Sequence, residues 1–314
     1  MEIIKPNTNI DFVGKRKIAF ALSLILILIG IVSLVVKGGP SYGIDFAGGT
    51  LVQVRFGENT TAAKVRESLK DLGLRSMTIQ QFGTQPDEFL VRAQESTTEL
   101  ESLAARVKTT LEKTYGAGKV EIRRTEMVGP KVSKSLRNQG LMAVLFAIAG
   151  MLIYITWRFE FRFGVGAVIA LVHDVLITLT FFSLLNKEID LTIIAAFLTI
   201  IGYSVNDTVI VCDRIRENMG KYPKDGLSSI INRSINETLS RTVMTSGMTM
   251  LAVLALYFFG GTVINSFAFA MLVGIIVGTY SSIYVASPVL LLWEKHKDGK
   301  TAVPAKGVVS QRNT

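Results

Sequence analysis

The sequence predicts an α-helical polytopic membrane protein with six transmembrane helices and one α+β domain outside the membrane. Three observations lead to this fold class. Of the 314 residues, 49% are hydrophobic, and the mean hydropathy is +0.41. The apolar residues gather in long blocks instead of spreading through amphipathic elements. A polar stretch, residues 37–138, separates the first block from the others.

Six blocks are long enough to cross a membrane, because a helix needs about 20 mainly apolar residues to span the hydrocarbon core. They are 18–36, 140–156, 164–185, 191–212, 243–259 and 263–288. The first block resembles a signal peptide, but it is too long for one and lacks a small-residue cleavage site. We therefore expect a retained anchor, followed later in the chain by five helices within residues 139–293.

Basic residues mark one side of the membrane. Six spans place both termini on the same side, and the Lys and Arg residues that flank the spans all fall in alternate segments. These residues are Lys15, Arg16, Lys17, Arg158, Arg162, Arg214, Arg216, Lys221, Lys224, Arg233, Lys295, Lys297 and Lys300. The positive-inside rule then predicts a cytoplasmic N-terminal segment (1–17), loop (213–241) and tail (294–314). This topology largely explains the net charge of +9, so nucleic-acid binding has little support.

The polar stretch 37–138 predicts a folded extracytoplasmic, or periplasmic, domain. Alternating apolar residues favour strands and apolar residues at helical spacing favour helices. The predicted order is strand 50–56, helix 61–72, strands 76–82 and 88–93, helix 97–115 and strand 119–128. This βαββαβ order is most simply assembled as a ferredoxin-like split βαβ sandwich.

The cytoplasmic loop 213–241 mixes charged and apolar residues. This pattern favours an amphipathic helix on the membrane surface. The loop serves either to dock a partner or gate the protein, or as a plain connector. The tail from Lys295 onward is polar, which favours disorder.

Two carboxylates, Asp174 and Asp207, interrupt the predicted spans. A charge at the bilayer centre costs about 2.5–3.5 kcal/mol, so such residues face a protein interior or a water path and mark ion or proton routes. His173 precedes Asp174, and histidine is the residue type that titrates nearest neutral pH. The alternatives are structural: Asp174 held by hydroxyls or amides of neighbouring helices, and His173 as a neutral ring in the bundle core.

Several motifs resemble those of a known family. They are residues 43–50 (Gly-Ile-Asp-Phe-Ala-Gly-Gly-Thr), 171–174, 202–208 with 212–218, and 240–247. Together with the six-span plan, they resemble the SecF family, the smaller halves of the SecDF membrane subunits of the bacterial Sec protein-export machinery. The resemblance covers nearly the whole chain. One departure is Cys212, where the family commonly has phenylalanine, at the end of a helix.

The resemblance implies half of an exporter-like bundle, related to resistance-nodulation-division exporters, in the bacterial cytoplasmic (inner) membrane. It implies use of the proton gradient, with SecD, to promote export of unfolded secretory polypeptide. The implied partners are SecD, the Sec translocation channel subunits, the polypeptide, protons and membrane lipid. Two alternatives stay open: a proton-driven exporter half for small molecules or lipids, and a non-transporting scaffold of the translocation channel.

The resemblance also implies a functional carboxylate and arginine at Asp207 and Arg241. Their helices run antiparallel, so a pairing near the cytoplasmic side is reasonable, whereas Arg241 could instead reach the lipid headgroups. Thr245 and Thr249 continue from Arg241 at helical spacing, to line a hydrated path or to join helices. We expect Asn206 to donate a hydrogen bond to a neighbouring helix.

Glycines form two further motifs. Gly43, Gly48 and Gly49 surround Asp45 and favour a tight exit from the bilayer, so we expect Asp45 to be structural, with a contact to SecD as the alternative. Residues 274–278 begin and end with glycine, a small-xxx-small face suited to packing against SecD or within the bundle.

The sequence lacks the signatures of an enzyme. It has no phosphate-binding Gly-x-x-x-x-Gly-Lys loop, which excludes ATP hydrolysis of that type. Cys212 is the only cysteine, so an intramolecular disulfide or a thiolate zinc site is excluded. His296 stands alone in the tail. We therefore expect neither a metal nor a cofactor, and energy supplied by the membrane or by a partner.

Overall fold

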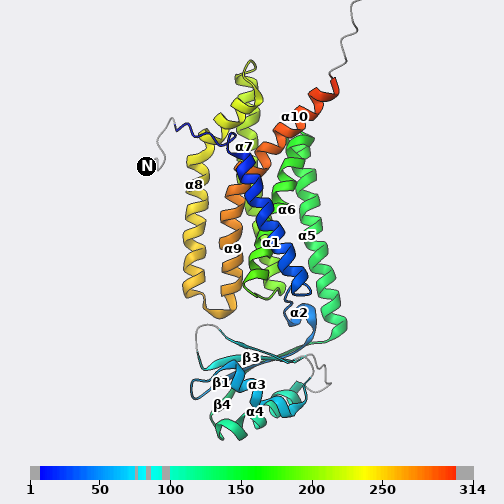
Figure 1. The fold of residues 1–314 in the computed structure, drawn as a ribbon, viewed down its shortest axis with the longest axis vertical. Coiled ribbons are helices and arrows are strands. Elements are labelled where there is room, and N and C mark those ends of the chain that lie inside the picture. The colour runs from blue at the N-terminus through cyan, green and yellow to red at the C-terminus, as the bar shows by residue number, and fades with distance from the viewer. Residues whose placement is uncertain (1–7, 75–76, 83–85, 94–99, 302–314) are drawn as a thin grey trace, which may run out of the picture.

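A bundle of long helices stands over a small α/β domain in the computed structural model, which describes residues 8–74, 77–82, 86–93 and 100–301 (Figure 1). Within these residues, six helical stretches are long and apolar enough to cross a membrane. A four-stranded antiparallel sheet forms the core of the small domain. The predicted fold class is therefore confirmed.

The membrane helices follow the predicted blocks and extend several of them. Five are α1 (Arg16–Val36), α5 (Pro130–Arg158), α6 (Phe161–Leu184), α7 (Leu191–Lys221) and α8 (Leu227–Phe259). The sixth stretch begins with α9 (Gly261–Ser281), continues through the π-helix η2 (Ser282–Ala286) and ends in α10 (Ser287–Thr301). α10 therefore carries helix into the segment that the composition favours as a disordered tail, while residues 302–314 lie outside the described residues.

The small domain lies between α1 and α5. It begins with the short helix α2 (Ile44–Ala47) and contains β1 (Gly49–Phe56), α3 (Ala62–Ser68), η1 (Lys70–Leu72), β2 (Thr78–Gln81), β3 (Glu88–Ala93), α4 (Leu100–Tyr115) and β4 (Val120–Val128). The strand order is β2-β3-β1-β4, with every neighbouring pair antiparallel. This is the ferredoxin-like arrangement predicted from βαββαβ. Val54 and Phe89 of the sheet pack against Val107 and Leu111 of α4.

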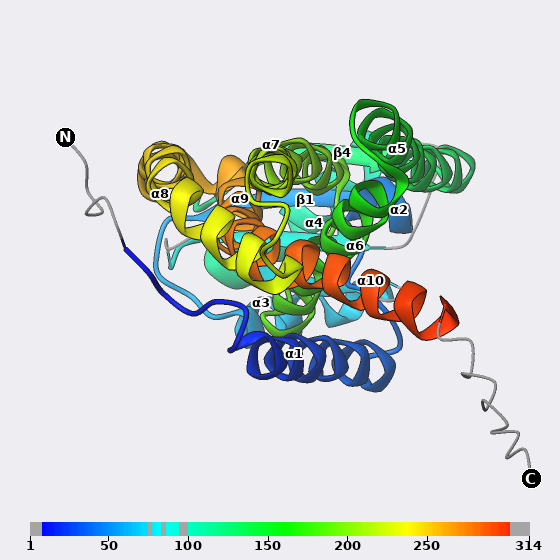
Figure 2. The ribbon, with the colours of Figure 1, turned by 90° about the horizontal axis from the view of Figure 1, so that it is seen from above.

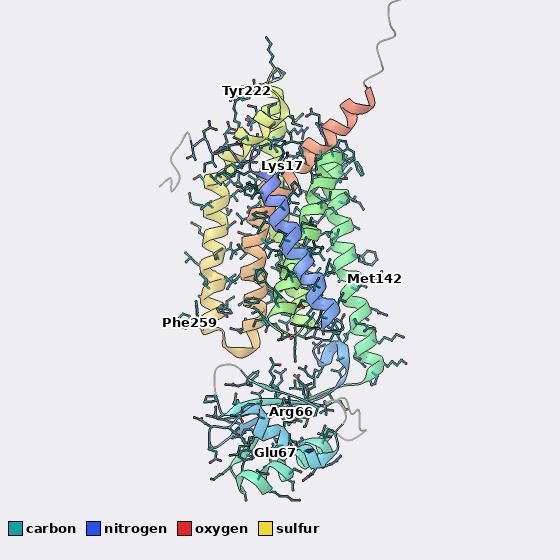
Figure 3. All side chains as sticks on the ribbon, in the orientation of Figure 1. Lys17, Arg66, Glu67, Met142, Tyr222 and Phe259 are labelled. Atoms are coloured by element: carbon teal, nitrogen blue, oxygen red, sulfur yellow. The ribbon has the colours of Figure 1, made fainter. Side chains whose placement is uncertain are left out.

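Both ends of the described chain lie at the end of the bundle away from the small domain (Figure 1). Lys17 and Tyr222 lie at that end, whereas Phe259 lies at the end nearer the domain (Figure 3). Residues 213–241 are not a separate surface helix, because α7 continues to Lys221 and α8 begins at Leu227. The first turns of α8 lie across the end of the bundle (Figure 2), which keeps part of this segment close to the expected surface position.

The domain is attached to the bundle at the loop between α6 and α7. The Gly43 amide donates to the Ile189 carbonyl and the Ile189 amide donates to the Ser41 carbonyl, each over 2.8 Å. Arg92 of β3 forms a two-pronged ion pair with Glu188 of the loop. Because Arg92 lies on the sheet face opposite the core residues of β3, that sheet face is turned toward the bundle.

Candidate functional site

Asp174 lies near the middle of α6 and is fully buried, with 0% of its surface exposed. Its Oδ1 lies 2.9 Å from His173 Nδ1. Its Oδ2 accepts hydrogen bonds from Ser204 of α7 over 2.6 Å and from Ser281 of α9 over 2.8 Å. Three helices thus converge on one carboxylate, and both of its oxygens have partners.

His173 continues this network toward α1. Its Nε2 lies 3.0 Å from Ser23 Oγ, and its ring stacks on Tyr280 with centroids 6.0 Å apart. The Ser23 and Tyr280 hydroxyl oxygens are 3.1 Å apart, and Tyr280 donates to the Ala19 carbonyl over 2.7 Å. The histidine is therefore not an isolated core ring but part of a polar chain that reaches the backbone of α1.

Asp207 of α7 is also fully buried, but it has fewer partners. Its Oδ2 accepts from Ser246 of α8 over 3.1 Å, and Ser246 lies 2.8 Å from Thr279 of α9. Its Oδ1 has no hydrogen-bond partner among the described residues. Since an unsatisfied buried polar group costs about 1–3 kcal/mol, this oxygen is poorly explained as a purely structural brace.

Arg241 lies near Asp207 but does not form an ion pair within the part of the chain that the structure describes. Its side chain is exposed on the outside of the bundle, while its charge acts on Asp207 from a distance. Thr245, one turn along α8, lies beside Asp207. The pairing of Arg241 with Asp207 stays a prediction.

The remaining polar residues of the predicted path differ in their positions. Thr245 and Thr249 donate to the backbone carbonyls of their own helix, at 3.1 Å and 3.0 Å respectively. Asn206 is exposed on α7, and no interhelical hydrogen bond of its side chain is found among the described residues. Its expected role as an interhelical donor stays a prediction. The helical rotation that buries Asp207 turns Asn206 outward.

The glycine motif positions Asp45 at the start of α7. Gly48 and Gly49 have φ angles of 75° and 110°, in the region that favours glycine. The Asp45 Oδ2 accepts a hydrogen bond from the Leu191 amide over 3.0 Å, and the α7 N-cap residue Asp190 accepts from the Ile193 amide over 3.0 Å. Asp45 therefore has a structural contact within the chain: it caps the helix that carries Ser204 and Asp207.

The small-xxx-small face of α9 packs within the bundle. A Cβ added at Gly278 would lie 3.1 Å from the Ser204 Cβ, and one at Gly274 would overlap Ile200. The glycines thus allow α9 to approach α7 closely at the level of the carboxylates. The sequence left two uses open for this face, packing against SecD and packing within the bundle. These contacts show packing within the bundle.

Sequence reasoning did not assign to the carboxylates the hydroxyl groups that bind them: Ser204, Ser246 and Ser281, with Ser23 and Tyr280 beyond them. Ser204 had a usable signal, because it lies three residues before Asp207 in the same motif. Ser23 is one of two serines in the mainly apolar first span, the other being Ser33. Ser246 stands beside Thr245 in the polar stripe that continues from Arg241. Ser281 had no signal, since membrane hydroxyls often bond only to their own helix, as Thr180 does to Leu176.

Comparisons with known proteins agree with this architecture. A family model described as "Protein export membrane protein SecD/SecF, C-terminal" matches residues 106–296, and another, "SecD/SecF GG Motif", matches residues 32–59. The protein translocase subunit SecF of Desulfurispirillum indicum is 50% identical over 292 residues, 90% of this chain and 91% of that protein. SecF of Magnetococcus marinus is 46% identical over 305 residues, 96% of this chain and 97% of that protein.

Solved structures show the same fold. A crystal structure of SecDF, a translocon-associated membrane protein from Thermus thermophilus, has a TM-score of 0.83 and 38% identity. The similarity covers 92% of this chain and 39% of that chain. For SecDF in a super-membrane-facing form the TM-score is 0.70 and the identity 37%, covering 96% of this chain and 41% of that chain. This chain thus spans less than half of each SecDF chain, whereas it spans more than nine-tenths of the two SecF proteins.

These matches extend over both the helix bundle and the glycine motif that precedes the sheet. The chain belongs to the SecD/SecF family as a SecF, a multi-pass protein translocase subunit of the SecDF export machinery in the cytoplasmic membrane, and this membership implies association with SecD.

Proposed function

We propose that this chain, paired with SecD, uses the proton gradient to promote export of unfolded polypeptides, and that Asp207 and Asp174 carry the protons. The observation that supports this most is the burial of both carboxylates inside the bundle, with Oδ1 of Asp207 lacking a partner among the described residues. A carboxylate oxygen without a hydrogen-bond partner is available to bind a proton. His173 and Arg241 complete the proposed path, one in contact with Asp174 and the other acting on Asp207.

The energetic scale is adequate for mechanical work. Moving one elementary charge through a membrane potential releases about 2.3 kcal/mol per 100 mV. A few protons therefore supply enough free energy to rearrange a small domain. The domain attached between α1 and α5 is the part of the chain that would act on the polypeptide as it emerges from the Sec translocation channel.

The proposed orientation places both termini and residues 213–241 in the cytoplasm and residues 37–138 outside. It is supported by the basic residues at the end of the bundle away from the sheet domain, where Lys17 lies (Figure 3). The five helices within residues 139–293 then form the rest of the membrane domain, in contact with lipid on their outer faces. Met142, for example, points outward from α5 (Figure 3).

We assign the SecD contact to the outer surfaces of α7 and α8, where Asn206 and Arg241 are exposed. Asn206 is exposed on α7 within a predicted span, and Arg241 is exposed on α8 at the cytoplasmic end of its span. Lipid is a poor environment for the Asn206 amide, because a polar group in hydrocarbon loses its hydrogen bonds to water. Transmembrane helices of SecD would supply the missing polar surroundings and bring a further set of residues close to Asp207.

The test is a vesicle preparation that contains this chain with SecD and the Sec channel, in which proton flux and release of a secreted polypeptide are both measured. Asp207→Asn, Asp174→Asn and Arg241→Met are expected to reduce both. Asp213→Asn is the matched control, because Asp213 is exposed on the same helix as Asp207. If the Asn variants leave both measurements unchanged, the chain is a non-transporting scaffold. Loss of flux with intact polypeptide release would point to export of a different substrate.

A further inference from the structure

When Asp174 is deprotonated, the chain of contacts that begins at this residue has one proton fewer than it has links. It has four links: Asp174 to His173, His173 to Ser23, Ser23 to Tyr280, and Tyr280 to the Ala19 carbonyl. A carboxylate and a carbonyl end the chain, and both can only accept. With a charged Asp174 and a neutral His173, the chain contains three protons, one each from His173, Ser23 and Tyr280. One of the four links is then left without a hydrogen bond.

One added proton completes the chain. When the Asp174–His173 pair holds this proton, both ring nitrogens of His173 take part in hydrogen bonds. One proton lies between Asp174 Oδ1 and His173 Nδ1, and Nε2–H donates to the Ser23 hydroxyl. The Ser23 hydroxyl then turns to donate to Tyr280, which donates to Ala19. No bond other than these N–H and O–H links changes, and the proton count of the four links rises from three to four. We infer that Asp174 and His173 bind the exchangeable proton as one unit, and that Ser23 and Tyr280 are positioning residues that transmit its presence to α1.

Among the described residues that act on Asp174, none other than His173 can carry a charge. The groups facing it are Ser204 of α7, Ser281 of α9 and His173 itself. Ser204 and Ser281 both donate to Oδ2, so Oδ1 alone carries the link to the histidine. The added proton is therefore placed between Oδ1 of Asp174 and Nδ1 of His173, and Nε2 of the same ring contacts Ser23 of α1.

α1 is well placed to respond. Only Ala19, Ser23 and Gly30 are buried along this helix, and two of these three belong to the chain of contacts. α1 continues directly into the small domain through Lys37 and the following glycines (Figure 1). A hydrogen bond gained or lost at Ser23 thus changes the attachment of the helix that carries that domain.

The backbone next to Tyr280 is irregular at the same position. α9 ends at Ser281, and the π-helix η2 follows immediately. Ser287 donates to the Ser282 carbonyl over 2.8 Å, which spans the widened turn. π-turns within α-helices occur often at functional sites, because they redirect side chains that a regular helix would place elsewhere.

This inference rests on the proposed function, and the test separates the two. Proton flux is measured as a function of pH in vesicles that contain this chain with SecD. Tyr280→Phe and Ser23→Ala each remove two of the four links. The protonated form then loses two hydrogen bonds and the deprotonated form only one, so the pair should lose its proton more easily. The midpoint of the pH profile is expected to move to lower pH by roughly half a unit to one unit, the size expected for one neutral hydrogen bond.

Two controls match these variants closely. Tyr284→Phe removes a hydroxyl from the neighbouring ring, which lies 5.1 Å from that of Tyr280 but is outside the chain of contacts. Ser33→Ala removes a serine contact between α1 and α6, the 2.8 Å contact with Ser183, away from Asp174. Neither should shift the midpoint. Ser23→Thr keeps the hydroxyl and should keep the midpoint of the parent.

The outcomes are distinct. If Asp174→Asn and His173→Asn abolish flux but Tyr280→Phe and Ser23→Ala leave the midpoint in place, the link to α1 is refuted and the proposed function stands. If Tyr284→Phe shifts the midpoint as much as Tyr280→Phe, the effect is not specific to the chain and the inference is again refuted. If Asp174→Asn and Asp207→Asn both leave flux intact, the proposed function fails and this inference fails with it.

Discussion

The close approach of α9 to α7 makes Gly274 sensitive to any added side chain. A Cβ at this position would lie 2.9 Å from Cγ2 of Ile200 and closer still to its Cγ1 and Cδ1. Ile200 is 1% exposed, and its β-branched side chain has one strongly preferred rotamer in a helix. The side chain cannot turn away, so Gly274→Ala forces the two helices apart.

The size of the effect follows from two opposing terms. Extra carbon in a packed interior costs about 1–3 kcal/mol, and the upper half of this range applies because three atoms of Ile200 must move. Alanine in place of glycine inside a helix gains about 1 kcal/mol. We expect Gly274→Ala to lower stability by roughly 1–2 kcal/mol. Gly150→Ala is the control: Gly150 lies within α5 with nothing within 4 Å of an added Cβ, so only the gain of up to about 1 kcal/mol remains.

Thermal unfolding of the purified protein in detergent measures this difference, about 2–3 kcal/mol between the two variants. A double-variant cycle sharpens the test. Ile200→Ala alone should cost about 2–5 kcal/mol because it leaves a cavity. Gly274→Ala added to that background should then stabilise, since the new methyl group enters the space that Ile200 vacates. Equal effects of Gly274→Ala and Gly150→Ala, or destabilisation in both backgrounds, would refute the close α7–α9 packing described here.

Three further predictions concern the ends of the bundle. Burial, assisted by the nearby charge of Asp45, raises the pKa of Asp190. The Asp190 carboxyl therefore holds its proton more tightly in the native state than in the unfolded chain. The stability of the protein falls as the pH rises from the unfolded pKa through this raised pKa. Asp190→Asn keeps the capping oxygen and should raise the melting temperature at neutral pH, with the gain lost near about pH 4. The Arg92–Glu188 pair, 14% and 23% exposed, should show a coupling of about 1.5–3 kcal/mol in a double-mutant cycle of thermal unfolding; the exposed pair Arg124–Glu126 serves as control, with about 0–1 kcal/mol, and equal couplings would contradict the clamp. Asn232→Ala removes the side chain that accepts from the Phe12 and Val13 amides at 2.9 Å and 3.2 Å; hydrogen exchange at both amides should accelerate, whereas exposed Asn138→Ala should have no effect there.

Much of the fold could be predicted because its determinants are local. The length of an apolar block sets the number of spans, and the alternation of residues such as Val52 and Val54 sets the strands of the small domain. The extensions of α7 and α8 beyond the membrane were missed, since a hydropathy pattern ends where charges begin although the helix continues. The π-helix was also missed, because it arises from packing at Ser282–Ala286 and has no composition of its own.

The site could be predicted only in part. Asp174, Asp207 and His173 stand out because a titratable group in an apolar block is costly and therefore visible in the sequence. Their partners are hydroxyls, which cost little in a helix and occur throughout the spans. Which of them turns toward a carboxylate depends on helix rotation and on distances between helices, as with Asn206, which is turned outward while the adjacent Asp207 is buried.

The depth of the two carboxylates relative to each other is also a property of the assembled bundle. Ser204 contacts Asp174 and lies three residues before Asp207 on α7, which places the carboxylates about 4.5 Å apart along the helix axis. α9 links them a second time, because Ser281 bonds to Asp174 and Thr279 contacts Ser246, the partner of Asp207. A shift of α7 or α9 that follows protonation at one carboxylate therefore changes the contacts of the other. The two residues lie in different spans of the sequence, yet in the folded protein the same two helices, α7 and α9, supply contacts to the surroundings of both.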